Sequence, residues 1–129
     1  MKPKSKKLDR YIKFPSHILQ SDNFASLSPK ACKLVWDLAS KCYGYNNGDL
    51  SMAWSDMKKR GWRSKETLYN ARDELVEKGW IVKTRQGWKN RCCLYGFTFL
   101  KIGEFGGRKL DVPEGTAATN DWKEWRPEN

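Results

Sequence analysis

The segment RGWRSKETLYNARDELVEKGWI, residues 60–81, constrains the fold of this chain more than any other. It looks at first like one amphipathic helix, but Gly61 and Ser64 interrupt it. Glycine ends helices readily, and a serine side chain caps the first free amides of the next helix. Gly79 marks the end of that second helix, whose narrow apolar stripe consists of Leu68, Ala71 and Leu75. The segment therefore predicts two helices joined by a short basic turn.

An earlier segment, LSPKACKLVWDLASKCYG, carries the start signals of another helix. Ser28 can cap it, and Pro29 suits the first helical position, where the missing N–H costs nothing. Trp36 falls off the apolar stripe, so we expect it to pack against a flanking segment such as YIKF or the C-terminal tail. The core stripe itself is formed by Ala31, Leu34, Val35, Leu38 and Cys42.

The remaining elements are a short extended piece, a supporting helix and a hairpin. YNNGDLSM predicts a turn and a very short strand, and the supporting helix is expected over residues 53–60. WIVKTRQ and CCLYGFTFL are rich in β-branched and aromatic residues, and the polar stretch GWKNR separates them. We predict an antiparallel hairpin with a basic tip at Trp88, and hence an α+β fold.

Charge narrows the list of partners. The 129-residue chain carries a formal net charge of +10, which favours polyanions, nucleic acid first and an anionic membrane surface second. No apolar run is long enough to cross a membrane, and the basic N-terminus lacks the apolar region of a signal peptide, so a cytoplasmic protein without a membrane partner is expected.

We divide the chain into three parts: a basic N-terminal arm at residues 1–13, one domain at 14–103 and an extended C-terminal tail at 104–129. The arm contains six basic residues and one acidic residue, a profile that suits either phosphate contact or simple solubility. The tail is rich in glycine, proline and acids.

Catalysis and metal binding find little support in the sequence. Cys32, Cys42, Cys92 and Cys93 form no CxxC pair, and we interpret them as reduced apolar fillers. His17 is the only histidine and has no matching nucleophile motif. We therefore expect a protein that is not an enzyme and that uses no cofactor and no metal.

The element order and the phrase SKETLYNARDELVEKGWIVKTR resemble the winged helix-turn-helix family of bacterial, phage and mobile-element DNA-binding proteins. In many members a Ser- or Thr-capped recognition helix ends in EKG, an aromatic residue and isoleucine. The resemblance covers about residues 28–99 and implies a three-helix core with a C-terminal β-hairpin wing that binds double-stranded DNA. The matching positions are Ser64, Leu68, Leu75, Glu77, Lys78, Gly79, Trp80 and Ile81.

A recognition helix presents its outward face to the base edges, while basic side chains around it contact phosphates. With the apolar stripe inward, Tyr69 and Asn70 point outward, and an asparagine can pair bidentately with adenine. Trp88 suits sugar or backbone packing, or it could fold back on the sheet. The predicted DNA-binding residues are Lys58, Lys59, Arg60, Arg63, Ser64, Lys65, Thr67, Tyr69, Asn70, Arg72, Arg85, Trp88, Lys89 and Arg91.

Several alternatives stay open at this level. Glu66 and Asp73 also point outward, and their carboxylates would repel phosphate. Alternatively, Glu66 interacts favourably with the helix dipole, and Asp73 accepts a hydrogen bond from cytosine or restrains Arg72. We expect Trp80 to be buried and Trp62 to lie in the turn beside the phosphate contacts.

The expected function is sequence-specific DNA binding by a small phage or mobile-element transcription regulator that occupies an operator. Origin binding in replication initiation is an alternative, and a homodimer is possible although no heptad specifies it. A third alternative is a protein-interaction module whose tail docks on a partner through Trp122 and Trp125, residues that could equally clamp the tail to its own domain.

Overall fold

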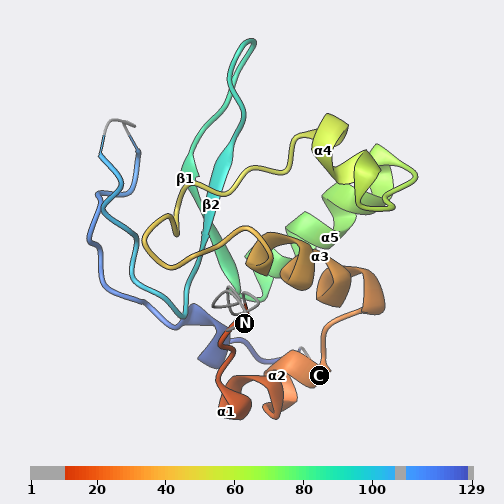
Figure 1. The fold of residues 1–129 in the computed structure, drawn as a ribbon. Helices are drawn as coiled ribbons and strands as arrows, with labels where there is room; N and C mark the ends of the chain where they lie inside the picture. Colours follow the sequence, from red (N-terminus) through yellow and green to blue (C-terminus); the bar gives the residue numbers. More distant parts are fainter. Residues whose placement is uncertain (1–10, 107–109, 128–129) are drawn as a thin grey trace, which may run out of the picture.

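The computed structural model describes residues 11–106 and 110–127 and has an α+β fold (Figure 1). The predicted order of helices and strands is confirmed between residues 29 and 97, whereas two short helices before it and a 3-10 helix after it were not predicted. Residues 1–10 of the expected basic arm lie outside the described residues. The elements are α1 (Ser16–Leu19), α2 (Asp22–Ala25), α3 (Pro29–Ala39), α4 (Trp54–Lys59), α5 (Lys65–Glu77), β1 (Ile81–Arg85), β2 (Leu94–Phe97) and the short 3-10 helix η1 (Asp121–Lys123).

Serine caps start both long helices, as predicted. The Ser28 side chain accepts a hydrogen bond from the Ala31 amide at 3.1 Å, and Pro29 occupies the first turn of α3. The Ser64 side chain accepts from the Thr67 amide at 3.1 Å at the start of α5. Each cap satisfies an amide that has no partner within its own helix, which stabilises the helix by about 1 kcal/mol.

The end of α3 differs from the prediction. The helix stops at Ala39, and Cys42, expected on the core stripe, is only half-buried. The amides of Lys41 and Cys42 donate to the carbonyls of Leu38 and Ala39, three residues back instead of four. This tighter turn breaks the helical spacing, so Cys42 packs only at the edge of the core.

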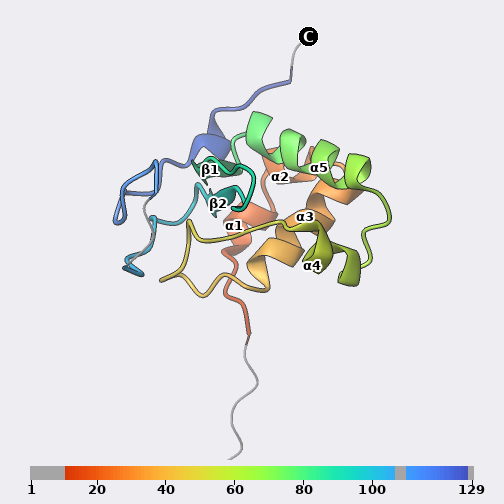
Figure 2. The same ribbon diagram turned by 90° about the horizontal axis from the view of Figure 1, so that it is seen from above.

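The core lies between α3, α5 and the hairpin. The side chains of Leu34, Leu38, Leu68 and Leu75 are fully buried and join the two long helices, and Trp80 is fully buried beside them. Figure 2 shows α3, α4 and α5 on one side of the hairpin and the irregular segment after residue 100 on the other. Burying each of these large side chains contributes about 1.5–3 kcal/mol to folding.

The hairpin is antiparallel, as predicted, with Ile81 opposite Phe97. Leu50 pairs with Tyr95 through two backbone hydrogen bonds of 3.1 and 2.8 Å, which confirms the short extended piece expected before α4. The register shifts between Lys83 and Arg85, and beyond that point the hairpin projects away from the helices (Figure 1).

The C-terminal segment returns to the domain. The Asn120 amide donates to the Thr98 carbonyl at 2.9 Å, and the buried indole of Trp122 stacks on Trp80 with 5.1 Å between ring centroids. A Cβ atom on Gly79 would lie 2.7 Å from the carbonyl of Asp121, so only glycine allows this close approach. Of its two alternative roles, Trp122 therefore clamps the tail to its own domain.

The two other tryptophans that the sequence left without a defined environment also have partners. Trp36 packs against Phe14 with 5.2 Å between ring centroids, as expected for a contact with the YIKF segment. Trp125 is half-buried, and the Lys78 ammonium lies 4.7 Å from its ring centroid.

Candidate nucleic-acid interface

Four exposed cations surround the junction of α4 and α5: Lys58, Lys59, Arg63 and Lys65, which we call the cationic turn. None of the four makes an ion pair or a side-chain hydrogen bond to another residue in the described part of the chain. Their charge is therefore balanced by solvent ions, and it remains free to meet an external anion.

A buried carboxylate holds this junction on α3. Asp37 is only 6% exposed and accepts hydrogen bonds from the Trp62 indole at 2.8 Å and from the Arg60 guanidinium at 3.2 Å. Lys33 forms a third contact to the same carboxylate at 3.2 Å. Because these contacts join α3 to the residues between α4 and α5, Asp37 fixes where the cationic turn sits.

The structure corrects the expected place of Trp62 and gives Arg60 a partner within the protein. Trp62 is 3% exposed, so it fills the core beneath the turn and does not lie beside phosphate contacts. Arg60 keeps a half-exposed side chain, but its guanidinium is already paired with Asp37. The role of Asp37 was not predicted from the sequence, although an acidic residue three positions after the buried Leu34 indicated a buried polar contact.

The outward face of α5 carries the predicted base-reading residues. Tyr69 is 38% exposed and Asn70 is exposed, one helical turn beyond the serine cap. The Arg72 guanidinium lies 4.6 Å from the Tyr69 ring centroid and donates to Asp73 at 2.9 Å. Burial opposes the charged form, yet the hydrogen bond to Asp73 raises the pKa of Arg72. Asp73 thus restrains Arg72, one of its two expected roles.

The hydroxyl groups at the start of α5 are occupied within the protein. Ser64 Oγ accepts the Thr67 amide and donates to Thr67 Oγ1 at 2.8 Å. Glu66 is exposed in the first helical turn, where a carboxylate is stabilised by the helix dipole. Ser64 and Thr67 therefore shape the helix start, and an external contact from either must compete with this cap.

The hairpin presents fewer cations than expected. Arg85 is 8% exposed and donates to the Cys92 carbonyl at 2.8 Å, so its predicted place on the free surface is wrong. The register shift after Lys83 is the physical cause, because a bulge leaves the neighbouring residues Thr84 and Arg85 both buried. Lys89 is exposed at the tip.

In Figure 1 the α4–α5 junction and the hairpin tip both rise on the upper side of the molecule, to either side of the space above α3. The structure thus places the cationic turn, the exposed residues of α5 and the hairpin tip on neighbouring elements. Arg85 and Trp62 are the two residues that it removes from the expected surface.

Glu74 locks α5 onto the start of α3. Its carboxylate accepts hydrogen bonds from the Ser28 amide at 2.8 Å and the Ser28 hydroxyl at 2.6 Å, and it pairs with Lys78 at 3.1 Å. Burial alone would raise the pKa of Glu74, but the hydrogen bonds from Ser28 lower it. The ionised form is therefore the one that the fold stabilises.

We expect Glu74→Gln to lower the free energy of unfolding by about 1–3 kcal/mol at neutral pH, because charged hydrogen bonds are lost. The folded pKa lies below the unfolded value, so this contribution is complete above the unfolded pKa and disappears as pH falls through the folded one. Denaturant titrations of both proteins across the acid range measure it. The exposed Glu77→Gln is the matched control, and a Glu74→Gln deficit that persists unchanged in acid would contradict this role.

Burial accounts for the other shifted groups. It raises the pKa of Tyr95 to about 12 and lowers the pKa of Lys41. It also raises the pKa of Cys32 and Cys42, so both remain neutral thiols, in line with their expected use as fillers.

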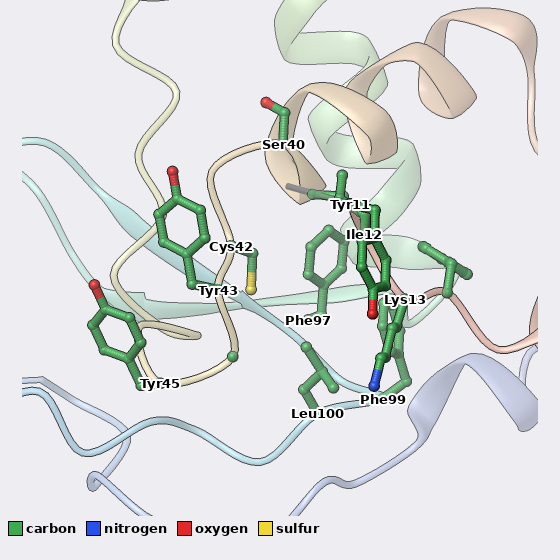
Figure 3. A pocket seen from close by; sticks show the side chains of 13 residues that line it. Tyr11, Ile12, Lys13, Ser40, Cys42, Tyr43, Tyr45, Phe97, Phe99 and Leu100 are labelled. Carbon is green, nitrogen blue, oxygen red and sulfur yellow. The ribbon is translucent and has the colours of Figure 1, made fainter. Parts of the chain in front are cut away.

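A groove of about 790 Å³ opens between the N-terminal segment, the loop after α3 and the residues at the end of β2 (Figure 3). The rings of Tyr43 and Tyr45 stack beside it at 6.3 Å. Among the described residues, the lining contains no carboxylate, no histidine and no member of the cationic turn. The lining residues are Tyr11, Ile12, Lys13, Phe14, Ala39, Ser40, Cys42, Tyr43, Gly44, Tyr45, Phe97, Phe99 and Leu100. The groove is thus an aromatic surface separate from the candidate interface.

Comparison of the chain with protein-family models, with characterised proteins and with solved structures finds no significant match. Among residues 11–106 and 110–127, no helix has the length and apolar character needed to cross a bilayer. Within the same ranges, no group of three or more His, Cys, Asp and Glu side chains is placed to hold a metal ion. A function must therefore be inferred from the geometry of the site.

Proposed function

We propose that this protein binds double-stranded DNA as a winged helix-turn-helix, with α5 in the major groove and the β1–β2 hairpin as the wing. The observation that carries the proposal is the cationic turn, four exposed and unpaired cations beside the N-terminal half of a capped helix. Phosphates are attracted both by such cations and by the free amides of a helix start.

The arrangement of elements supports this assignment. The helices α3, α4 and α5 form the three-helix core, Leu50 adds a minimal strand to the sheet, and β1 follows α5 directly. The helices α1 and α2 and the clamped tail are additions to that plan. The hairpin extends beyond the core, as a wing must in order to reach DNA beside the recognition helix (Figure 1).

Each exposed group has a specific task in the proposed complex. The cationic turn contacts phosphates and positions α5 without reading sequence. Asn70 pairs with adenine, and Tyr69 contacts a phosphate or a thymine methyl group. Arg72 remains bound to Asp73 and Tyr69 and orients the tyrosine ring, while Lys89 contacts the backbone from the wing.

Within this function, we propose transcription regulation by operator occupancy, in a phage or mobile-element context. Origin binding in replication initiation would use the same surface. Docking of the tail on another protein is less well supported, because Trp122 is 5% exposed and stacked on Trp80.

Selection from random duplexes at two salt concentrations tests the proposal. We expect one enriched motif and a steep loss of binding as salt rises, because counterions are released when cations meet phosphates. A palindromic motif would indicate that two copies bind together. Absence of retention even at low salt would contradict DNA binding.

We expect Asn70→Ala to relax preference at one base position by about 1–3 kcal/mol, the discrimination supplied by a bidentate contact. The measurement is the selected motif of the variant compared with that of the parent protein. Glu77→Gln, an exposed change on the same helix, is the control and should leave the motif intact. An unchanged motif for Asn70→Ala would remove Asn70 as a reader.

A further inference from the structure

Trp88 is the most exposed tryptophan of the described chain, at 67%, and it pairs with Arg91 at the turn of the hairpin. The hairpin projects away from the helices (Figure 1). Trp88 did not fold back on the sheet, and it makes no ring contact with another aromatic residue within the described ranges. Its indole therefore contributes nothing to the hydrophobic core, and stability of the fold does not account for a tryptophan there.

The backbone holds this side chain in a defined place. The Trp88 amide donates to the Arg91 carbonyl at 3.0 Å, and the Arg91 amide donates to the Trp88 carbonyl at 2.8 Å. These paired bonds close a tight turn whose two central residues are Lys89 and Asn90. Trp88 and Arg91 therefore face each other across the last rung of the hairpin.

One face of the indole is already covered by a cation. The Arg91 guanidinium lies 4.5 Å from the ring centroid of Trp88, and that same side chain also reaches the Gln86 carbonyl at 3.5 Å. With 67% of the residue still exposed, the rest of the ring remains open to solvent. An aromatic ring backed by a guanidinium has the chemistry that stacks a nucleobase, and Lys89 beside it can contact the DNA backbone.

We propose that Trp88 and Arg91 form a stacking platform for an unpaired nucleobase, so that the protein prefers DNA in which a duplex adjoins unpaired bases. This inference rests on the proposed DNA-binding function and specifies its substrate. In a continuous duplex both faces of every internal base are occupied by neighbouring bases, and a protruding indole finds only sugar and phosphate. A bulged or terminal unpaired base offers a free face.

The length of the hairpin separates the platform from the reading helix. From Ile81 to Trp88 the chain can span about 23 Å at 3.3 Å per residue, so the platform can stand well away from the C-terminal end of α5. The two contacts can then form on one DNA molecule, with α5 on paired DNA and Trp88 on an unpaired base beside it.

The experiment uses the full chain and three labelled DNAs: a fully paired duplex, the same duplex with one unpaired thymine bulge, and the same duplex with a single-stranded extension. We expect the two DNAs with unpaired bases to bind about 5- to 100-fold more tightly, the range that one stacked base supplies. Trp88→Ala should erase this preference, so that the variant binds all three DNAs with nearly equal affinity.

Two matched variants sharpen the test. Trp88→Phe retains an aromatic face and should keep part of the preference for unpaired bases. Lys89→Ala removes a neighbouring charge and should lower the affinity for all three DNAs by the same factor. Because the tip lies outside the core, the thermal midpoint of Trp88→Ala should match that of the parent protein.

The outcomes separate this inference from the proposed function. Equal affinity of the parent protein for all three DNAs would overturn the platform while leaving duplex binding intact. If Trp88→Ala lost the same factor of affinity for all three DNAs, the platform would be overturned as well, because the indole would then pack against the DNA backbone. Binding only to DNA with unpaired bases would support the platform and contradict the major-groove assignment. Binding to none of the DNAs would contradict both.

Discussion

Replacing Lys58, Lys59 and Lys65 together by alanine is expected to weaken binding to any duplex by as much as about a hundredfold near physiological salt. Each phosphate contact contributes about 0.9 to the slope of log affinity against log salt, so the variant should have a slope shallower by about 2.7. The three lysines are exposed and unpaired within the described chain, and their removal disrupts no hydrogen bond of the fold.

Anisotropy titrations with a labelled duplex at several salt concentrations measure both quantities. The matched control replaces Lys13, Lys30 and Lys101 by alanine, three exposed lysines outside the cationic turn. The control loses the same net charge, and it should retain most of the affinity because long-range attraction is screened by salt. If both triple variants lose affinity by the same factor, only the net charge of the protein affects binding, and the lysines of the cationic turn do not contact the DNA.

Trp122→Ala is expected to lower the free energy of unfolding by about 3–5 kcal/mol, the usual cost of truncating a buried tryptophan. The indole is 5% exposed, it stacks on the fully buried Trp80, and its N–H donates to the Asn120 side-chain oxygen at 3.3 Å. Without the indole, a cavity forms beside Trp80, and the C-terminal segment around η1 loses its main contact with the domain.

Denaturant unfolding followed by circular dichroism checks this value without relying on tryptophan fluorescence. Trp125→Ala is the internal control, because its ring is only half-buried and lies against the Lys78 ammonium, and about 0.5–1 kcal/mol is expected. Below its unfolding transition, Trp122→Ala should bind duplex as tightly as the parent protein. A stability equal to that of the parent would mean that the clamp contributes nothing and would favour a tail available for docking.

Local chemistry made much of this fold predictable. Ser28 and Ser64 indicate helix starts, because their side chains accept hydrogen bonds from backbone amides three residues later. Gly61 and Gly79 announce helix ends because both adopt positive φ angles, 95° and 80°. The hairpin follows from two runs rich in β-branched and aromatic residues on either side of a polar turn. Exposure of Tyr69, Asn70 and the cationic turn then follows from helical periodicity.

Contacts between segments distant in sequence decided the rest. Trp62 looked like a turn residue, but the carboxylate of Asp37, on another helix, holds its indole in the core. Arg85 looked exposed, but a register shift and the Cys92 carbonyl across the hairpin bury it.

The sequence by itself thus determined the order of the elements, their caps and the position of the cationic turn, because each depends on neighbours within a few residues. Only the tertiary structure decided that Trp122 closes over Trp80 and that Trp88 stays open to solvent. The two residues have the same chemistry, and their opposite environments arise from which distant segments reach them. Gly79 leaves room for the tail at one end of the hairpin, whereas at the other end Trp88 contacts the neighbouring Arg91 and stays 67% exposed.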